Sequence, residues 1–128
     1  MFKTRKVKLI PMSLPNTQPA ACVANLILYK SFTENKPITK GQLAKILLTA
    51  AAVYNTNTNR RLLSELIEGD GFVASLRHYY ASTADNKILD NFVLVASPTG
   101  QPTAYYADGN EYIIDAVNIA WAGFTAEN

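Results

Sequence analysis

Two apolar segments joined by a short polar linker constrain the fold of this chain more than any other feature. Residues 20–32 carry apolar side chains on nearly every face, which is typical of a helix buried on several sides. Residues 43–54 repeat apolar side chains at helical spacing. Thr39 and Gln42 stand just before them in the form of a capping box, which marks a helix start. The sequence therefore predicts a core around two helices, over 20–32 and 40–54.

Three further segments show helical spacing of apolar residues. The pattern in 59–68 and in 72–81 predicts a third and a fourth helix. Residues 111–122 follow the same spacing almost without fault, although many of their side chains also favour strands. We expect a fifth helix there, ending at Gly123, with a third antiparallel strand as the alternative.

A β-hairpin is predicted over residues 88–107. Residues 88–96 and 103–107 have the composition of strands, and the turn between them contains proline and glycine. Residues 4–10 form another extended segment that could join this hairpin. The expected fold class is α+β, a mainly helical core of four to five helices with the hairpin packed at one side. The order of these elements is closest to that of a winged helix.

The whole chain is expected to form a single domain. Its 128 residues match the common length of one domain, and its 48% hydrophobic content is sufficient for a core of its own. Residues 1–10 form a basic arm or strand, and the prolines in 11–19 make that segment an irregular connector. Cys22 is the single cysteine and His78 the single histidine, so neither an internal disulfide nor a Cys/His metal site is expected. No cofactor is predicted.

The start of the chain lacks the features of an export signal. Its basic residues are followed by a segment that Pro11 and Pro15 interrupt, whereas an export signal needs a continuous apolar region. No stretch approaches the roughly 18 apolar residues of a membrane span. We therefore expect a cytoplasmic protein without a membrane partner.

The charges are distributed unevenly along the chain. Residues 1–61 hold ten Lys/Arg and the single acid Glu34, whereas residues 62–128 hold two Lys/Arg and nine Asp/Glu. Clustered charge selects partners, and this pattern predicts a small non-enzymatic protein that binds DNA or RNA phosphates through its basic half. The alternative is a self-assembling structural or protein-interaction protein, in which the basic half of one copy meets the acidic half of the next.

The basic residues of the first half are the predicted contacts with nucleic acid. They are Lys3, Arg5, Lys6, Lys8, Lys40, Arg60 and Arg61. As a mobile arm, the first four could follow phosphates or enter a minor groove. As a strand, they would place lysines on one face and protect a sheet edge from wrong pairing.

Arg60 and Arg61 fall in the first turn of the predicted third helix, where the helix dipole is positive, and Glu65 and Glu68 fall toward its negative end. Sequences break such local rules where function requires it, and a helix-turn-helix would use arginines there for phosphates or bases. The opposing interpretation is an ordinary solvated helix face, on which the two glutamates would repel phosphate.

No catalytic residue is predicted. His78 has no assigned carboxylate partner, and no nucleophile motif is present. The pairs Tyr79–Tyr80 and Tyr105–Tyr106 fit base stacking or, by their spacing, packing in a core or interface. We therefore expect no enzymatic activity.

Overall fold

The computed structural model describes residues 8–11, 19–65, 67, 73–96, 99–107 and 111–127. These residues form, in chain order, β1 (Lys8–Pro11), α1 (Ala20–Thr33), α2 (Lys40–Thr58), α3 (Ala74–Tyr79), β2 (Leu94–Ala96), β3 (Pro102–Tyr106) and α4 (Glu111–Glu127). The described part of the chain is mainly helical, and its class is α+β, as predicted.

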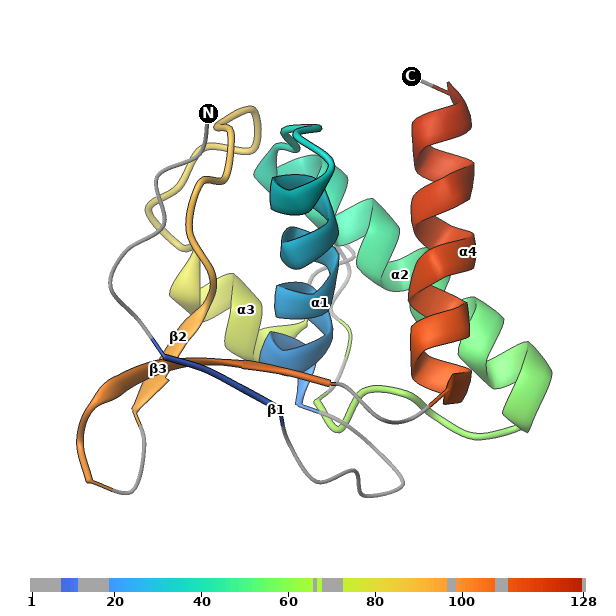
Figure 1. Ribbon diagram of the computed structural model, residues 1–128, viewed down its shortest axis with the longest axis horizontal. Coiled ribbons are helices and arrows are strands. Elements are labelled where there is room, and N and C mark those ends of the chain that lie inside the picture. The colour runs from blue at the N-terminus through green and yellow to red at the C-terminus, as the bar shows by residue number, and fades with distance from the viewer. Residues whose placement is uncertain are drawn as a thin grey trace.

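Helix α1 lies in the middle of the molecule, with the small sheet on one side and α2 and α4 on the other (Figure 1). Its sequence is apolar on nearly every face because β3 and three helices pack around it. Val23, Ile27 and Leu28 have no solvent exposure. The predicted helix over 20–32 is therefore confirmed, together with its burial on several sides.

One polar side chain of α1 reaches the sheet region. Asn25 is only 1% exposed. Its Nδ2 donates to the carbonyl oxygens of Val93 (3.0 Å) and Tyr105 (2.7 Å), and its Oδ1 accepts from the Val93 backbone N–H (2.6 Å). A single buried amide thus fixes the central helix to both arms of the hairpin region, and its buried polar atoms are all satisfied.

The strands form a three-stranded sheet in the order β1-β3-β2. Strands β2 and β3 are antiparallel and correspond to the predicted hairpin, which is shorter than expected because residues 88–93 lie outside the strand. Strand β1 pairs in parallel with β3, from Lys8 opposite Thr103 to Pro11 opposite Tyr106. Residues 8–11 therefore form a strand, and residues 1–7 lie outside the described residues.

Helix α2 begins where the capping box predicts. The Thr39 hydroxyl accepts from the Gln42 N–H, and Gln42 Oε1 accepts from the Thr39 N–H. At its other end, α2 continues beyond the predicted end at residue 54 through a polar run of Asn and Thr, and the Thr58 hydroxyl donates to the Tyr54 carbonyl oxygen at 2.7 Å. The helix ends only at Asn59, which adopts a left-handed conformation with φ 55°.

The predicted third helix over 59–68 is wrong, because the described residues 59–65 form no helix. The longer α2 includes residues 55–58, which lie between the two predicted helices. The chain then leaves α2 in irregular conformation and places the adjacent side chains of Leu62 and Leu63 in the core, each 1% exposed. The helix pair required for a winged-helix order is not formed here, so that order is not confirmed.

The predicted fourth and fifth helices are present with different bounds. Helix α3 is shorter than the predicted 72–81, and α4 is longer than 111–122, which excludes a third antiparallel strand there. Gly123 does not end α4, which continues to Glu127. A Cβ at Gly123 would meet no atom within 4 Å, so this glycine lies on an open helix face.

Candidate interaction surface

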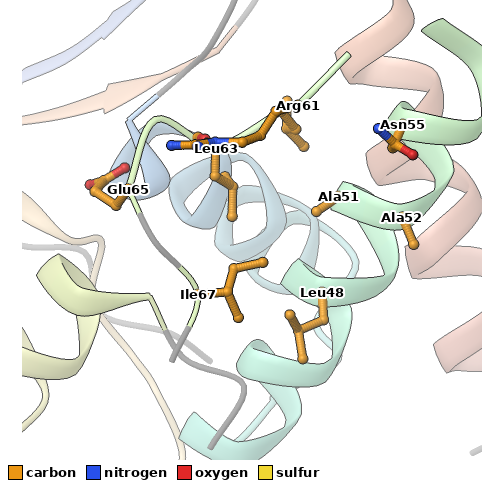
Figure 2. A pocket seen from close by; sticks show the side chains of 9 residues that line it. Leu48, Ala51, Ala52, Asn55, Arg61, Leu63, Glu65 and Ile67 are labelled. Carbon is orange, nitrogen blue, oxygen red and sulfur yellow. The ribbon is translucent and has the colours of Figure 1, made fainter. Parts of the chain in front are cut away.

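An apolar cleft of about 490 Å³ lies between α2 and the segment that follows it. Leu48, Ala51 and Ala52 of α2 line one wall, and Leu63 and Ile67 line the other. Figure 2 shows Leu48 and Ile67 facing each other across the cleft, with Arg61 extended along its rim. The cleft therefore forms at the place where α2 ends and the chain turns back along it.

The polar side chains at the rim of this cleft form hydrogen bonds within the molecule. Arg61 donates from Nε to the Leu63 carbonyl oxygen and from Nη2 to the Ser64 carbonyl oxygen, each at 2.6 Å. Asn55 Nδ2 donates to the Arg60 carbonyl oxygen at 3.3 Å. These bonds shape the turn after α2, and what the cleft offers to a partner is mainly apolar surface.

Glu65, also at the rim, caps the central helix. Its Oε1 accepts from the Ala20 backbone N–H at 2.8 Å and from the Ser64 hydroxyl, and its Oε2 accepts from the Ser75 hydroxyl. A carboxylate at a helix N-terminus is favourable because the dipole is positive there. Glu65 therefore joins α1 and α3 to the segment after α2.

The charge mismatch expected in 59–68 does not occur at its described members Arg60, Arg61 and Glu65, and Glu68 lies outside the described residues. Arg60 and Arg61 follow the C-terminal end of α2, where a cation is favourable, and Glu65 lies at the N-terminal end of α1, where an anion is favourable. The structure thus obeys the local rule that the predicted helix would have broken. Arg60 and Arg61 therefore do not begin a recognition helix, because no helix starts at these residues.

The predicted contact residues that the structure describes at the two ends of α2, Lys40 and Arg60, lie far apart. Lys40 begins α2 and Arg60 follows its end, so the 19-residue helix separates them by about 28 Å. The Lys40 side chain is 14% exposed, and its Nζ donates to the carbonyl oxygens of Tyr80 (3.2 Å) and Thr83 (3.0 Å). Lys8 lies in β1, while Lys3, Arg5 and Lys6 lie outside the described residues.

The basic and acidic halves of the sequence also meet in the fold. Lys40 Nζ lies 3.4 Å from Asp85 Oδ1. The Gly41 and Lys40 N–H groups at the start of α2 donate to the carbonyl oxygens of Asp85 and Lys87. Basic and acidic residues are therefore interleaved at this end of α2.

A second apolar groove, of about 420 Å³, lies between α2 and α4. Lys45, Leu48 and Thr49 line it from α2, and Gly123 and Phe124 line it from α4. Leu48 borders both this groove and the cleft, so apolar surface continues across the outer face of α2. We call this region, the cleft and the groove together, the α2 face.

Sequence reasoning missed the α2 face because its apolar residues look like core residues. One signal was available in α4. Ile119 stands outside the apolar helical spacing that marks the buried face of this helix, and in the structure it is 51% exposed.

The other candidate groups show no catalytic arrangement. His78 is exposed on α3, and no group of His, Cys, Asp and Glu in the described part of the chain could hold a metal ion. Burial of Cys22, with a smaller effect of Glu65, raises the pKa of its thiol to about 11, which keeps the thiol protonated and unreactive at neutral pH. None of the described helices is both long and apolar enough to cross a membrane.

Comparisons with known proteins add no family to this description. No protein-family model, no curated protein and no solved structure matches the chain.

Proposed function

We propose that this chain is a self-assembling protein that associates with a second copy through the α2 face. The observation that carries the proposal is the apolar cleft beside α2, whose rim groups Asn55, Arg61 and Glu65 are already hydrogen-bonded within the molecule. Such a surface favours apolar contacts and offers no acid–base pair for a reaction. Contiguous apolar surface with a polar rim is typical of protein interaction sites.

The charges of the two helices beside the groove favour a second copy as the partner. The charged residues of α2 are the basic Lys40 and Lys45, whereas those of α4 are all acidic, among them Glu111 and Asp115. The two helices pack against each other at one side of the molecule (Figure 1). In a two-fold contact, α2 of each copy would meet α4 of the other, so that opposite charges approach twice. This arrangement keeps the predicted contact between basic and acidic regions of two copies, but limits it to α2 of one copy and α4 of the other.

Light scattering after gel filtration tests the proposal. We expect a dimer at about 0.01 M ionic strength that dissociates toward about 1 M, since the screening length falls from about 30 Å to about 3 Å. A monomer at low salt and high protein concentration would refute self-assembly. Association that strengthens with salt would contradict the charge pairing.

A pair of matched variants locates the contact. Ala52→Glu places a carboxylate in the cleft at an exposed helix position, and we expect it to give a monomer at every concentration that yields a wild-type dimer. Thr56→Glu adds the same charge one turn later on the same helix, outside the residues that line the cleft, and should leave the dimer intact. Equal effects of the two substitutions would exclude the α2 face as the interface.

Nucleic-acid binding is a second proposal, supported by the exposed side chains of Lys45 and Arg60 on and just beyond α2. It includes the predicted residues of the N-terminal segment and no longer depends on a helix-turn-helix. Fluorescence anisotropy with a labelled random-sequence duplex at low salt tests it. We expect the logarithm of affinity to fall with that of salt by about 0.9 for each phosphate contacted. An unchanged anisotropy would remove this proposal, and neither proposal includes a catalysed reaction.

A further inference from the structure

A third groove, of about 380 Å³, differs from the α2 face in its chemistry. It lies between α1, the end of β3 and α4, and its walls include the rings of Tyr29 and Tyr106. Lys30 and Glu34 line it from α1, and Asn118 lines it from α4. Small-molecule sites commonly combine aromatic walls with a few polar groups that fix orientation, and this volume is in their range.

The two tyrosine rings provide an aromatic wall with partly uncovered faces. Their planes are inclined by only 11°, and their centroids are 6.4 Å apart, so the rings are stacked. Stacked aromatic rings at this centroid separation are offset from each other, so each ring covers only part of the other's face. Tyr29 is 46% exposed, which leaves a large aromatic surface open to a ligand.

Glu34 occupies an unusual position in this groove. It is the single acid of residues 1–61, and it stands at the C-cap of α1, where the helix dipole disfavours a negative charge. Its Oε1 accepts from Trp121 Nε1 at 2.9 Å, which holds the carboxylate in place. An acid kept at an unfavourable helix end is a deviation of the kind that function explains.

The polar groups of this groove remain available to a ligand. Within the described part of the chain, Glu34 Oε2, the Lys30 ammonium and the Asn118 side-chain amide form no hydrogen bond. This contrasts with the cleft beside α2, whose rim groups are engaged internally. Together these groups supply several donors and acceptors around an aromatic wall.

We propose that this groove binds a neutral saccharide ring. The C–H face of a sugar ring fits the negative face of an aromatic ring, and each sugar hydroxyl both donates and accepts hydrogen bonds, which matches the mixed set around the wall. Lys30 and Glu34 cancel each other's charge, so the groove favours an uncharged ligand over a phosphorylated one. This site shares none of its lining residues with the α2 face.

The indole N–H of Trp121 provides a reporter for this site. It is the only tryptophan of the chain and donates to the carboxylate that lines the groove, so its NMR signal is unique and sensitive to binding. Titration of the ¹⁵N-labelled protein with neutral hexoses and their short oligomers should shift this signal saturably. We expect millimolar dissociation constants, because a ligand of one ring makes few contacts.

Substitutions test whether the aromatic wall itself binds the saccharide. Tyr106→Ala and Tyr29→Ala should each weaken binding about tenfold, whereas Tyr79→Ala, at another exposed tyrosine, should not change it. Glu34→Gln keeps an oxygen for Trp121 and should weaken binding without changing the amide spectrum elsewhere. The proposal is overturned if no saccharide shifts the indole signal, if the tyrosine variants bind as tightly as wild type, or if nucleosides bind more tightly than saccharides.

Discussion

Asn25 shows how much a single buried amide contributes to this fold. Replacing it with leucine keeps the size of the side chain but removes three hydrogen bonds to the main chain of Val93 and Tyr105. We expect Asn25→Leu to lower the free energy of unfolding by about 3–5 kcal/mol, because buried groups would lose their partners. Urea denaturation measures the loss. Asn57→Leu, at an exposed position of α2, is the control and should change stability by less than about 0.5 kcal/mol.

Cys22 makes the reactivity of the folded chain dependent on pH. Its pKa is raised to about 11 by burial and, to a smaller extent, by Glu65, whereas the pKa of an unfolded cysteine is about 8.5. At pH about 8.5, we expect iodoacetamide to modify the folded protein about a hundredfold more slowly than the protein in urea, because the thiolate is the nucleophile. Mass spectrometry follows the modification, and equal rates in the two states would contradict the burial.

The same shift has a defined effect on stability. Between pH about 8.5 and 11 the folded chain keeps a proton that the unfolded chain releases, so this contribution is complete below about 8.5 and is lost as pH rises toward 11. Stability measured by urea denaturation should therefore fall over this range. The stability of the Cys22→Ala variant should fall less steeply with pH. An equally steep fall in both proteins would show that other groups cause it.

At the scale of elements, replacing a glycine with alanine should change stability in opposite directions in α4 and in the hairpin turn. Gly123 lies inside α4 with open space around it, so Gly123→Ala should stabilise the protein by about 0.5–1 kcal/mol. Gly100 also has open space but adopts φ +82°, so Gly100→Ala should destabilise it by about 1 kcal/mol. Thermal unfolding followed by circular dichroism should give melting temperatures on opposite sides of wild type. Shifts in the same direction would contradict the assigned backbone conformations.

The sequence predicted best those helices that are marked by residues close to one another along the chain. The apolar spacing of α1 and the capping box of α2 involve residues at most a few turns apart, and both are confirmed. The predicted end of α2 at residue 54 was wrong because the Asn and Thr residues that follow favour loops only weakly. In the fold these residues remain helical as far as Thr58, and α2 as a whole packs against α4.

The candidate surface could be predicted only in part. Arg61 was selected from the sequence and lies at the rim of the cleft, but it belongs to a turn and not to a helix. The wall residues Leu48 and Ile67 have the same composition as core residues. Their position beside a cleft follows from where α2 ends, which depends on contacts distant in sequence.

At the scale of the whole molecule, α1 connects the other parts into one cooperative unit. It contacts α2, α3, α4 and β3, and the buried residues form one continuous cluster. We expect two-state unfolding, with the same urea midpoint for Trp121 fluorescence and for far-ultraviolet circular dichroism. Two separate midpoints would show that part of the structure unfolds independently.

The parallel pairing of β1 with β3 has a consequence for the order of events during synthesis. Residues 8–11 pair with residues 103–106, so this strand has no partner until most of the chain has been made. At about 5–20 residues per second, the ribosome needs about 5–20 s to reach β3 after β1 has been made. During that time the first strand must remain unpaired while α1 and α2, which come earlier and need only local contacts, can already form. The sheet is therefore completed late, by closing nearly the whole chain onto its own beginning.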